Sequence, residues 1–267
     1  MLVNGTLYNL EAVNTITEKH LKQLEQCDRM LMRNLFQCPV GTPLESFYIE
    51  TSTQPIRFIL QGRRLLYLWT MLQKPSTELA RQVFDAQLNN PVKGDWVSVV
   101  KKDLSICEIE LSMSEIASSS RSCFKSLVSR KMKEQTEKYL RKLQNDHKKT
   151  RNLIISEKIQ PYLLSEELTS DDKVMLFKLR CEMLDFKGNY PNKYRHSRKG
   201  LICELCDDQL SQDLQTHVYM CPIYLSHHEL GPQLRDSQYD DIFSHSTQVK
   251  AAKLWMQILE FRRLVLE

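Results

Sequence analysis

The stretch "LICELCDDQLSQDLQTHVYMCPIY" (residues 201–224) holds three of the chain's eight cysteines and one of its seven histidines. Its spacing is Cys-x2-Cys-x10-His-x3-Cys, formed by Cys203, Cys206, His217 and Cys221. Zinc prefers four nitrogen or sulfur ligands in a tetrahedron, and a Cys-x2-Cys turn presents two thiolates to one ion. His217 and Cys221 are four residues apart, which places both on one face of a helix. The segment therefore predicts one zinc ion bound by these four residues.

Four protein ligands leave no position for water or substrate, so the expected zinc is structural rather than catalytic. Such an ion supplies folding free energy on the order of 10 kcal/mol, enough to order a segment with little core of its own. His227 and His228 are alternative candidates for the fourth ligand position. The competing interpretation is that three buried cysteines and a surface histidine share this stretch by chance.

The other five cysteines (Cys27, Cys38, Cys107, Cys123 and Cys181) are scattered and show no paired spacing. We expect them to be reduced core residues of an intracellular protein rather than a disulfide framework. The first residues lack the basic region of a secretory signal. Because no apolar run approaches the ~20 residues that a membrane span needs, we expect no membrane partner.

The composition predicts an all-α chain. Glycine accounts for 7 of 267 residues, far below its usual share of about 7%. Long runs are rich in Leu, Lys, Glu, Gln and Met, which lose little side-chain freedom in a helix. Apolar periodicity and capping residues predict helices over residues 17–36, 55–72, 76–90, 121–151, from 169 onward, and 247–267. We expect a multi-helix unit followed by a small metal-binding unit with a C-terminal helix, in segments 1–95, 96–200 and 201–267.

The segment from Arg121 to Arg151 is the electropositive part of the chain. It contains eleven lysines and arginines and three acids, a net charge of +8, whereas the whole chain carries +4. An apolar stripe on the predicted helix, which is a packing face first, comprises Phe124, Val128, Met132, Tyr139 and Leu143. The alternative is that the charges form only a solvated face, but such faces normally mix signs, so the bias favours phosphate binding.

A second basic segment, residues 187–200, is broken by Gly and Pro and leads directly to Cys203. Arg63 and Arg64 lie in a largely apolar predicted helix, where such side chains usually reach the surface or pair with an acid. A phosphate contact is the alternative for these two. The candidate nucleic-acid contacts are Arg63, Arg64, Arg130, Lys131, Lys133, Lys138, Arg141, Lys142, Lys148, Lys149, Lys193, Arg195, Arg198 and Lys199.

Four stretches, in order, resemble a known family. They are "LKQLEQCDRMLMRNLF" (21–36), "GTPLESFYIETSTQPIRFILQGRRLLYL" (41–68), "DAQLNNPVKGDWVSVVKKDL" (85–104) and "KIQPYLLSEELTSDDKVMLFKLRCEMLDFKGNYPNKY" (158–194), followed by the Cys-Cys-His-Cys knuckle. This order over some 220 residues resembles the region downstream of the catalytic palm in endonuclease–reverse transcriptases of non-LTR retrotransposons. The resemblance implies a thumb-like region at 1–95, a linker at 96–200, and binding of RNA or DNA by thumb and knuckle.

The catalytic parts of that family are not found. Tyr239-Asp240-Asp241 lies after the knuckle, lacks the family's spacer between the aromatic residue and the acids, and is expected to be a surface acidic turn. The 46 residues after Cys221 are too few for the nuclease domain of some relatives. Met1 falls where the thumb would begin, as in a separately retained C-terminal piece.

The sequence therefore predicts a nucleic-acid-binding accessory region of a retroelement reverse transcriptase, not an enzyme, with a structural zinc. Its partners would be RNA or DNA and a polymerase subunit supplied separately. Two alternatives stay open. One is a zinc-stapled protein–protein adaptor whose charges serve solubility, and the other is a non-functional retroelement remnant.

Overall fold

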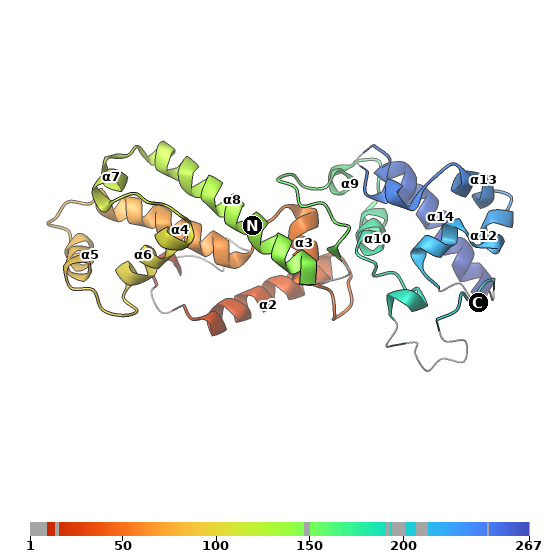
Figure 1. Ribbon diagram of the computed structural model, residues 1–267, viewed down its shortest axis with the longest axis horizontal. Helices are drawn as coiled ribbons and strands as arrows, with labels where there is room; N and C mark the ends of the chain where they lie inside the picture. Colours follow the sequence, from red (N-terminus) through yellow and green to blue (C-terminus); the bar gives the residue numbers. More distant parts are fainter. Residues whose placement is uncertain are drawn as a thin grey trace. The chain divides into compact units, whose positions relative to one another are not determined.

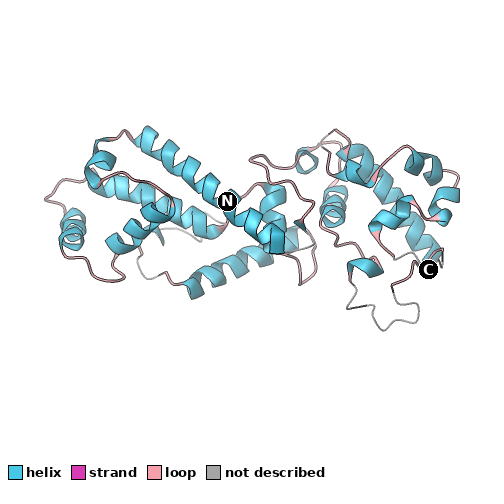
Figure 2. Cartoon of the chain, viewed as in Figure 1, coloured by secondary structure: helices cyan, strands magenta, loops and turns pink. Residues whose placement is uncertain are grey.

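The chain is all-α, as the composition predicts. A computed structural model describes residues 10–13, 16–146, 150–190, 193, 201–206, 213–244 and 246–266. Within these ranges no β-strand is found, and helices joined by loops make up the fold (Figure 2). None of the described helices is long and apolar enough to cross a membrane.

Local sequence signals explain where several helices begin. α2 (Glu18–Leu35) follows Thr17, whose hydroxyl accepts the N–H of His20. α10 (Ser170–Arg180) begins with a capping box in which Thr169 and Asp172 satisfy each other's backbone N–H groups. These starts agree with the helices expected from residues 17 and 169. Helix α14 (Gln248–Leu266) likewise matches the expected closing helix.

Contacts between residues divide the chain into two units, the first made of residues 1–29 and 54–142. Its helices pack around an apolar core that includes Phe58, Leu65, Val97, Phe124 and Met132. The helices of this unit are η1 (Leu10–Ala12), most of α2, α4 (Ile56–Leu72), α5 (Leu79–Asn89), α6 (Trp96–Ile106), α7 (Met113–Ser118) and most of α8 (Arg121–Asp146), which continues beyond residue 142 (Figure 1).

The second unit comprises residues 30–53 and 143–267. The rings of Phe36, Phe47 and Phe177 pack together in it, with centroids 4.3–5.7 Å apart. Its elements beside α10 and α14 are α3 (Leu44–Thr51), α9 (Pro161–Leu164), η3 (Lys187–Asn189), η4 (Gln215–Tyr219), α12 (Pro222–Ser226), α13 (Leu230–Arg235) and η5 (Tyr239–Ile242). This unit contains the predicted metal ligands.

The two units do not coincide with the three segments expected from the sequence. Residues 30–53 belong with the C-terminal part because α3 packs there, although they precede α4 in the chain. The expected boundaries at residues 95 and 200 stay predictions about domain organisation.

Other local expectations are corrected. No helix is predicted from the sequence in the serine-rich region before Arg121, but it contains the short helix α7, which is started by a capping box at Ser112. Cys38, Cys107 and Cys181 are buried as expected, but Cys27 and Cys123 are exposed because each lies on the solvent side of its helix. On α8 the buried side chains are Phe124, Val128, Met132, Thr136 and Leu140, whereas Tyr139 and Leu143 are only half-buried.

Candidate metal centre

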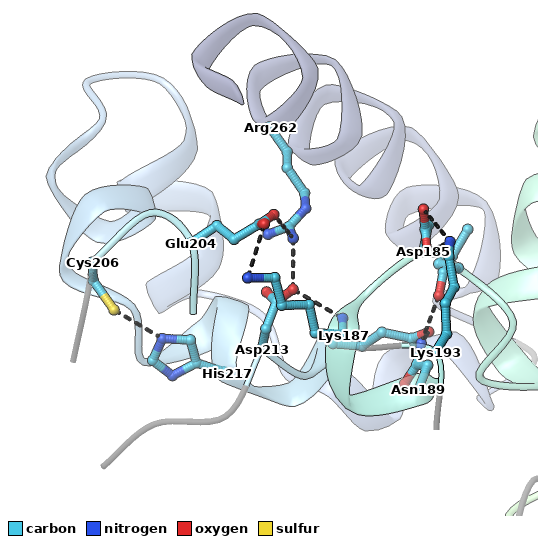
Figure 3. Close-up of polar contacts among 11 residues, drawn as sticks. Asp185, Lys187, Asn189, Lys193, Glu204, Cys206, Asp213, His217 and Arg262 are labelled. Carbon is cyan, nitrogen blue, oxygen red and sulfur yellow. Dashed lines mark hydrogen bonds and ion pairs between the residues drawn. The ribbon is translucent and has the colours of Figure 1, made fainter. Parts of the chain in front are cut away.

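The four predicted ligands come together in unit 2. The ligand atoms of Cys203, Cys206, His217 and Cys221 all lie within 4.8 Å of one another. The Cys206 Sγ and His217 Nε2 atoms are 3.3 Å apart (Figure 3). Cys203, His217 and Cys221 are buried, and Cys206 is half-buried. The cluster is therefore shielded from solvent on most sides.

Backbone N–H groups support both buried sulfurs. The N–H groups of Leu205 and Cys206 donate to the Cys203 sulfur, within the tight turn that the Cys-x2-Cys spacing forms. Those of Ile223 and Tyr224 donate to the Cys221 sulfur in the same way, where Cys221 precedes the first turn of α12. Charge-assisted hydrogen bonds of this kind stabilise thiolates, which are the form of cysteine that binds metals.

The two buried thiols titrate as a pair. A hydrogen bond from the Cys221 thiol, together with the backbone N–H groups, lowers the pKa of Cys203 from 9.0 to about 4. The same hydrogen bond, with burial, raises the pKa of Cys221. A divalent cation would displace the protons of these thiols, because metal ligands must be deprotonated.

His217 and Cys221 reach the cluster by a route that differs from the expected single helix. His217 lies in the 3₁₀ helix η4, which ends at Tyr219, and Cys221 is the N-cap of the next helix, α12. A hydrogen bond from the Cys221 N–H to the His217 carbonyl, 2.8 Å, joins the two elements. The two ligand atoms do come together, as expected. They do so through a single helical turn that joins η4 to α12, rather than from one continuous helix. Pro222 explains the break, since proline favours the first position of a new helix.

Beside the cluster lies a network of charged side chains, which Figure 3 shows around Arg262 of α14. The Arg262 guanidinium is 2.7 Å from Asp213 and 3.4 Å from Glu204, and the Lys187 ammonium is 2.9 Å from Glu204. Burial raises the pKa of Asp213, while the Lys187 N–H and Arg262 oppose this effect. The network connects two loop residues, Glu204 after Cys203 and Asp213 before η4, to Lys187 of η3 and Arg262 of α14.

The backbone approaches closely at the same place. The Gly188 N–H donates to the Asp213 carbonyl over 2.9 Å. A Cβ atom at Gly188 would lie 2.3 Å from the Leu214 Cδ2 atom and 3.1 Å from the Asp213 carbonyl oxygen. Only glycine fits here without a shift, so η3 can support the segment that carries His217.

The donor set fits a tetrahedral metal ion. Three sulfurs and one imidazole nitrogen are the ligands of closed structural zinc sites. In such a site neighbouring ligand atoms would be about 3.8 Å apart for two sulfurs and about 3.5 Å for sulfur and nitrogen, given metal–ligand bonds of ~2.3 and ~2.0 Å. The Cys206–His217 separation of 3.3 Å is close to these values, whereas the widest separation in the cluster, up to 4.8 Å, is about 1 Å longer. His227 is not part of the group; its ring packs on Phe261, with centroids 4.6 Å apart.

The candidate nucleic-acid contacts on α8 fall into two classes. Arg130, Lys133 and Lys142 are exposed, and Lys133 has an interaction with another residue. The remaining three form ion pairs: Lys131 with Glu108 and Glu134, Lys138 with Glu108, and Arg141 with Glu137. Lys148 and Lys149 lie outside the described residues.

The other candidates are also distributed rather than gathered. The Arg64 Nε atom is 2.7 Å from the buried Asp103 carboxylate. Pairing with an acid is the usual role expected of an arginine in a largely apolar helix. Arg63 is half-buried and has an interaction with another residue. Lys193 is exposed and lies 3.1 Å from Asp185 (Figure 3). Arg195, Arg198 and Lys199 lie outside the described residues.

Tyr239-Asp240-Asp241 forms the short helix η5, as an acidic turn would. Asp241 caps this helix together with Gln238, and the Tyr239 hydroxyl accepts a hydrogen bond from Gln215. Both contacts are structural.

Comparisons with protein-family models, with curated proteins and with solved structures find no match for this chain. The likeness to retroelement reverse transcriptases therefore rests on the order of its sequence motifs alone.

Proposed function

We propose that this chain binds RNA or DNA through phosphate contacts along α8, and that it acts by binding rather than by catalysis. The observation that carries the proposal is the charge of the first half of α8. Residues 121–133 contain five basic side chains and no acid. Four of these, Arg121, Lys125, Arg130 and Lys133, are exposed. A solvated helix face normally mixes the two signs.

The acids that pair with α8 lie beside its second half. Glu134 and Glu137 are on the helix itself, and Glu108 precedes α7. Lys131 and Lys138 flank Glu108, and the Arg141 guanidinium is 2.6 Å from Glu137. Net positive charge is therefore greatest on the first half, although Lys131 there pairs with Glu134.

The stability of α8 itself does not account for these charges. The positive end of a helix dipole lies at the N-terminus, where acids stabilise a helix and cations destabilise it. α8 has no acid in its first turn and begins with Arg121. A phosphate partner gives these cations a role that the isolated helix does not.

The proposal extends to the metal and to the partner. We propose that the ion held by the cysteine and histidine cluster is zinc and that it is structural, since the four ligands would complete its shell. The order of motifs supports an accessory role beside a separate polymerase subunit of a retroelement. In that role the chain would hold template or target strands while another chain supplies catalysis.

The test is binding of a single-stranded RNA and of a duplex DNA across several salt concentrations. The variant Arg130→Gln/Lys133→Gln/Lys142→Gln removes three exposed cations from α8. Its matched control, Lys22→Gln/Lys93→Gln/Lys101→Gln, removes three exposed cations elsewhere in unit 1. We expect the first variant to lower the slope of log affinity against log salt by about 2 for the single strand, since each phosphate contact contributes about 0.7.

An equal decrease of the salt slope in both triple variants would overturn the assignment of phosphate binding to α8. A lack of salt-sensitive binding in the unmodified protein would favour the adaptor alternative. One observation supports that alternative: Leu79 and Val83, one turn apart on α5, are 75% and 49% exposed. Apolar side chains in that arrangement fit a protein partner.

A further inference from the structure

A pocket of about 640 Å³ lies in unit 1 between α4 and the first turns of α8. Its volume is within the range of roughly 300–1,000 Å³ that small ligands occupy. The described residues that line it are Leu66, Trp69, Arg121, Ser122, Phe124 and Lys125. No acid is among them. The pocket thus has an apolar wall from α4 and Phe124, and a cationic wall from α8.

The apolar wall is held in place. The Trp69 indole N–H donates to the Ser119 carbonyl over 3.0 Å, and the side-chain amide of Gln73, one turn further on, donates to the Ala117 carbonyl over 2.7 Å. These two bonds attach α4 to the end of α7 and the entry to α8. Trp69 remains only half-buried, so part of its ring system faces the pocket. Phe124 is 1% exposed and belongs to the apolar core.

The cationic wall consists of exposed side chains one helical turn apart. Arg121 and Lys125 stand at positions i and i+4 of α8, so their side chains are neighbours. Both line the pocket beside Phe124, at the edge of the helix's buried stripe. Ser122 adds a hydroxyl, which lies 3.1 Å from that of Ser120. Two cations at the edge of an aromatic surface match a ligand that has both a phosphate and a planar ring.

We propose that this pocket receives one nucleotide of a single-stranded nucleic acid, with the base against Trp69 and the phosphate held by Arg121 and Lys125. Every base has a π-face, and stacking on an aromatic side chain is the usual way in which single strands bind without sequence preference. In a duplex these faces are covered by neighbouring base pairs, so the pocket selects for single strands. The inference rests on the proposed function, because it identifies where α8 binds its strand.

The experiment compares two probes of equal charge: a 20-nucleotide oligothymidine, and a 20-unit oligomer of the same phosphate backbone with abasic sugars throughout. Binding to the full chain is measured at one fixed salt concentration. We expect the unmodified protein to prefer the oligothymidine by on the order of tenfold, the effect of stacking one base on an aromatic ring. Trp69→Leu should abolish this preference. Trp69→Phe, which loses the same indole hydrogen bond but keeps an aromatic face, should retain most of it.

A second pair of variants tests the cationic wall. Arg121→Gln/Lys125→Gln should weaken binding of both probes and lower the salt slope by about 1.4. The control, Lys101→Gln/Lys102→Gln, removes two exposed cations of α6 in the same unit and should reduce the slope less.

Equal affinity for the two probes in the unmodified protein would overturn the pocket assignment and leave backbone binding by α8 intact. A preference for oligothymidine that survives in Trp69→Leu would also overturn it. If neither probe binds, the proposed function fails, and the pocket assignment fails with it.

Discussion

At the scale of single residues, the most consequential contact in unit 2 is a completely buried ion pair. The Arg180 guanidinium donates to both Glu50 carboxylate oxygens, at 2.8 and 3.0 Å, and both side chains are 0% exposed. The Tyr162 hydroxyl donates to the same carboxylate, and the Ile242 carbonyl accepts from Arg180. Because every partner comes from a different element, the pair connects α3, α9 and η5 through α10.

Arg180→Met should therefore destabilise unit 2 strongly. Without the guanidinium, Glu50 would be a buried charge without compensation, which costs about 3–5 kcal/mol. The measurement is the free energy of unfolding of unit 2 in urea, followed by circular dichroism. The matched control, Arg263→Met, removes a guanidinium from an exposed pair with Glu260 on α14 and should leave the transition essentially unchanged. A similar small effect in both variants would contradict the structural role of the buried pair.

The buried thiol of Cys107 gives the stability of unit 1 a dependence on alkaline pH. Burial, with the nearby Asp103 carboxylate, raises the pKa of Cys107 from 9.0 to about 12. As pH rises above 9, the unfolded chain loses this proton while the folded chain keeps it, so stability falls. Between pH 8 and pH 10 the free energy of unfolding should fall by about 1 kcal/mol because of Cys107, and Cys107→Ala should abolish this part of the decrease. Urea unfolding at the two pH values measures this; Cys123→Ala, at an exposed thiol, should keep the full loss.

At the scale of elements, sequence periodicity predicts the helices better than it predicts their roles. The apolar stripe and charges of α8 are local features, and α8 forms where they predict it. The pairing of Lys131 and Lys138 with an acid involves Glu108, which lies more than twenty residues earlier in the chain. The pocket at its start depends on Trp69 in α4. Arg121 and Lys125 belong to the basic segment 121–151, but no sequence pattern indicates that they lie near Trp69.

The metal ligands show the same division. Ligand type and spacing are local, and they identify all four residues that meet in the cluster. The helix expected to carry His217 and Cys221 is instead η4 followed by α12, since Pro222 starts a new helix. Lys187 and Arg262 support the cluster from outside, and no sequence pattern indicates this role. Their partners, Glu204 and Asp213, are brought to them only by the fold.

At the scale of the whole molecule, each unit has its own apolar interior, and only unit 2 contains the metal ligands. Metal binding supplies folding free energy to the unit that holds the site. Loss of the metal should therefore act on one unit more than on the other.

The unmodified protein should retain one equivalent of zinc after purification, and Cys206→Ser should lose it. The midpoint temperature for unfolding of unit 2 should fall by roughly 10 °C or more, with loss of amide protection at residues 201–206 and 213–226. Cys123→Ser, at an exposed cysteine of unit 1, is the control and should keep both metal and stability. Metal analysis and hydrogen exchange measure the two effects. An equal loss of protection in unit 1 would show that the two units unfold as one.

The sequence by itself determined the helical class, the approximate starts of α2, α4, α5, α8, α10 and α14, the four candidate metal ligands and the basic character of α8. All of these depend on residue type and on spacings of a few residues, which act through local geometry. Only the tertiary structure decided that residues 30–53 join the C-terminal unit, that Arg64 pairs with Asp103, and that Trp69 lines one pocket with Arg121 and Lys125. These arrangements bring together residues tens of positions apart. They form because packing of apolar surfaces brings distant segments together, and no local pattern records which segments will meet.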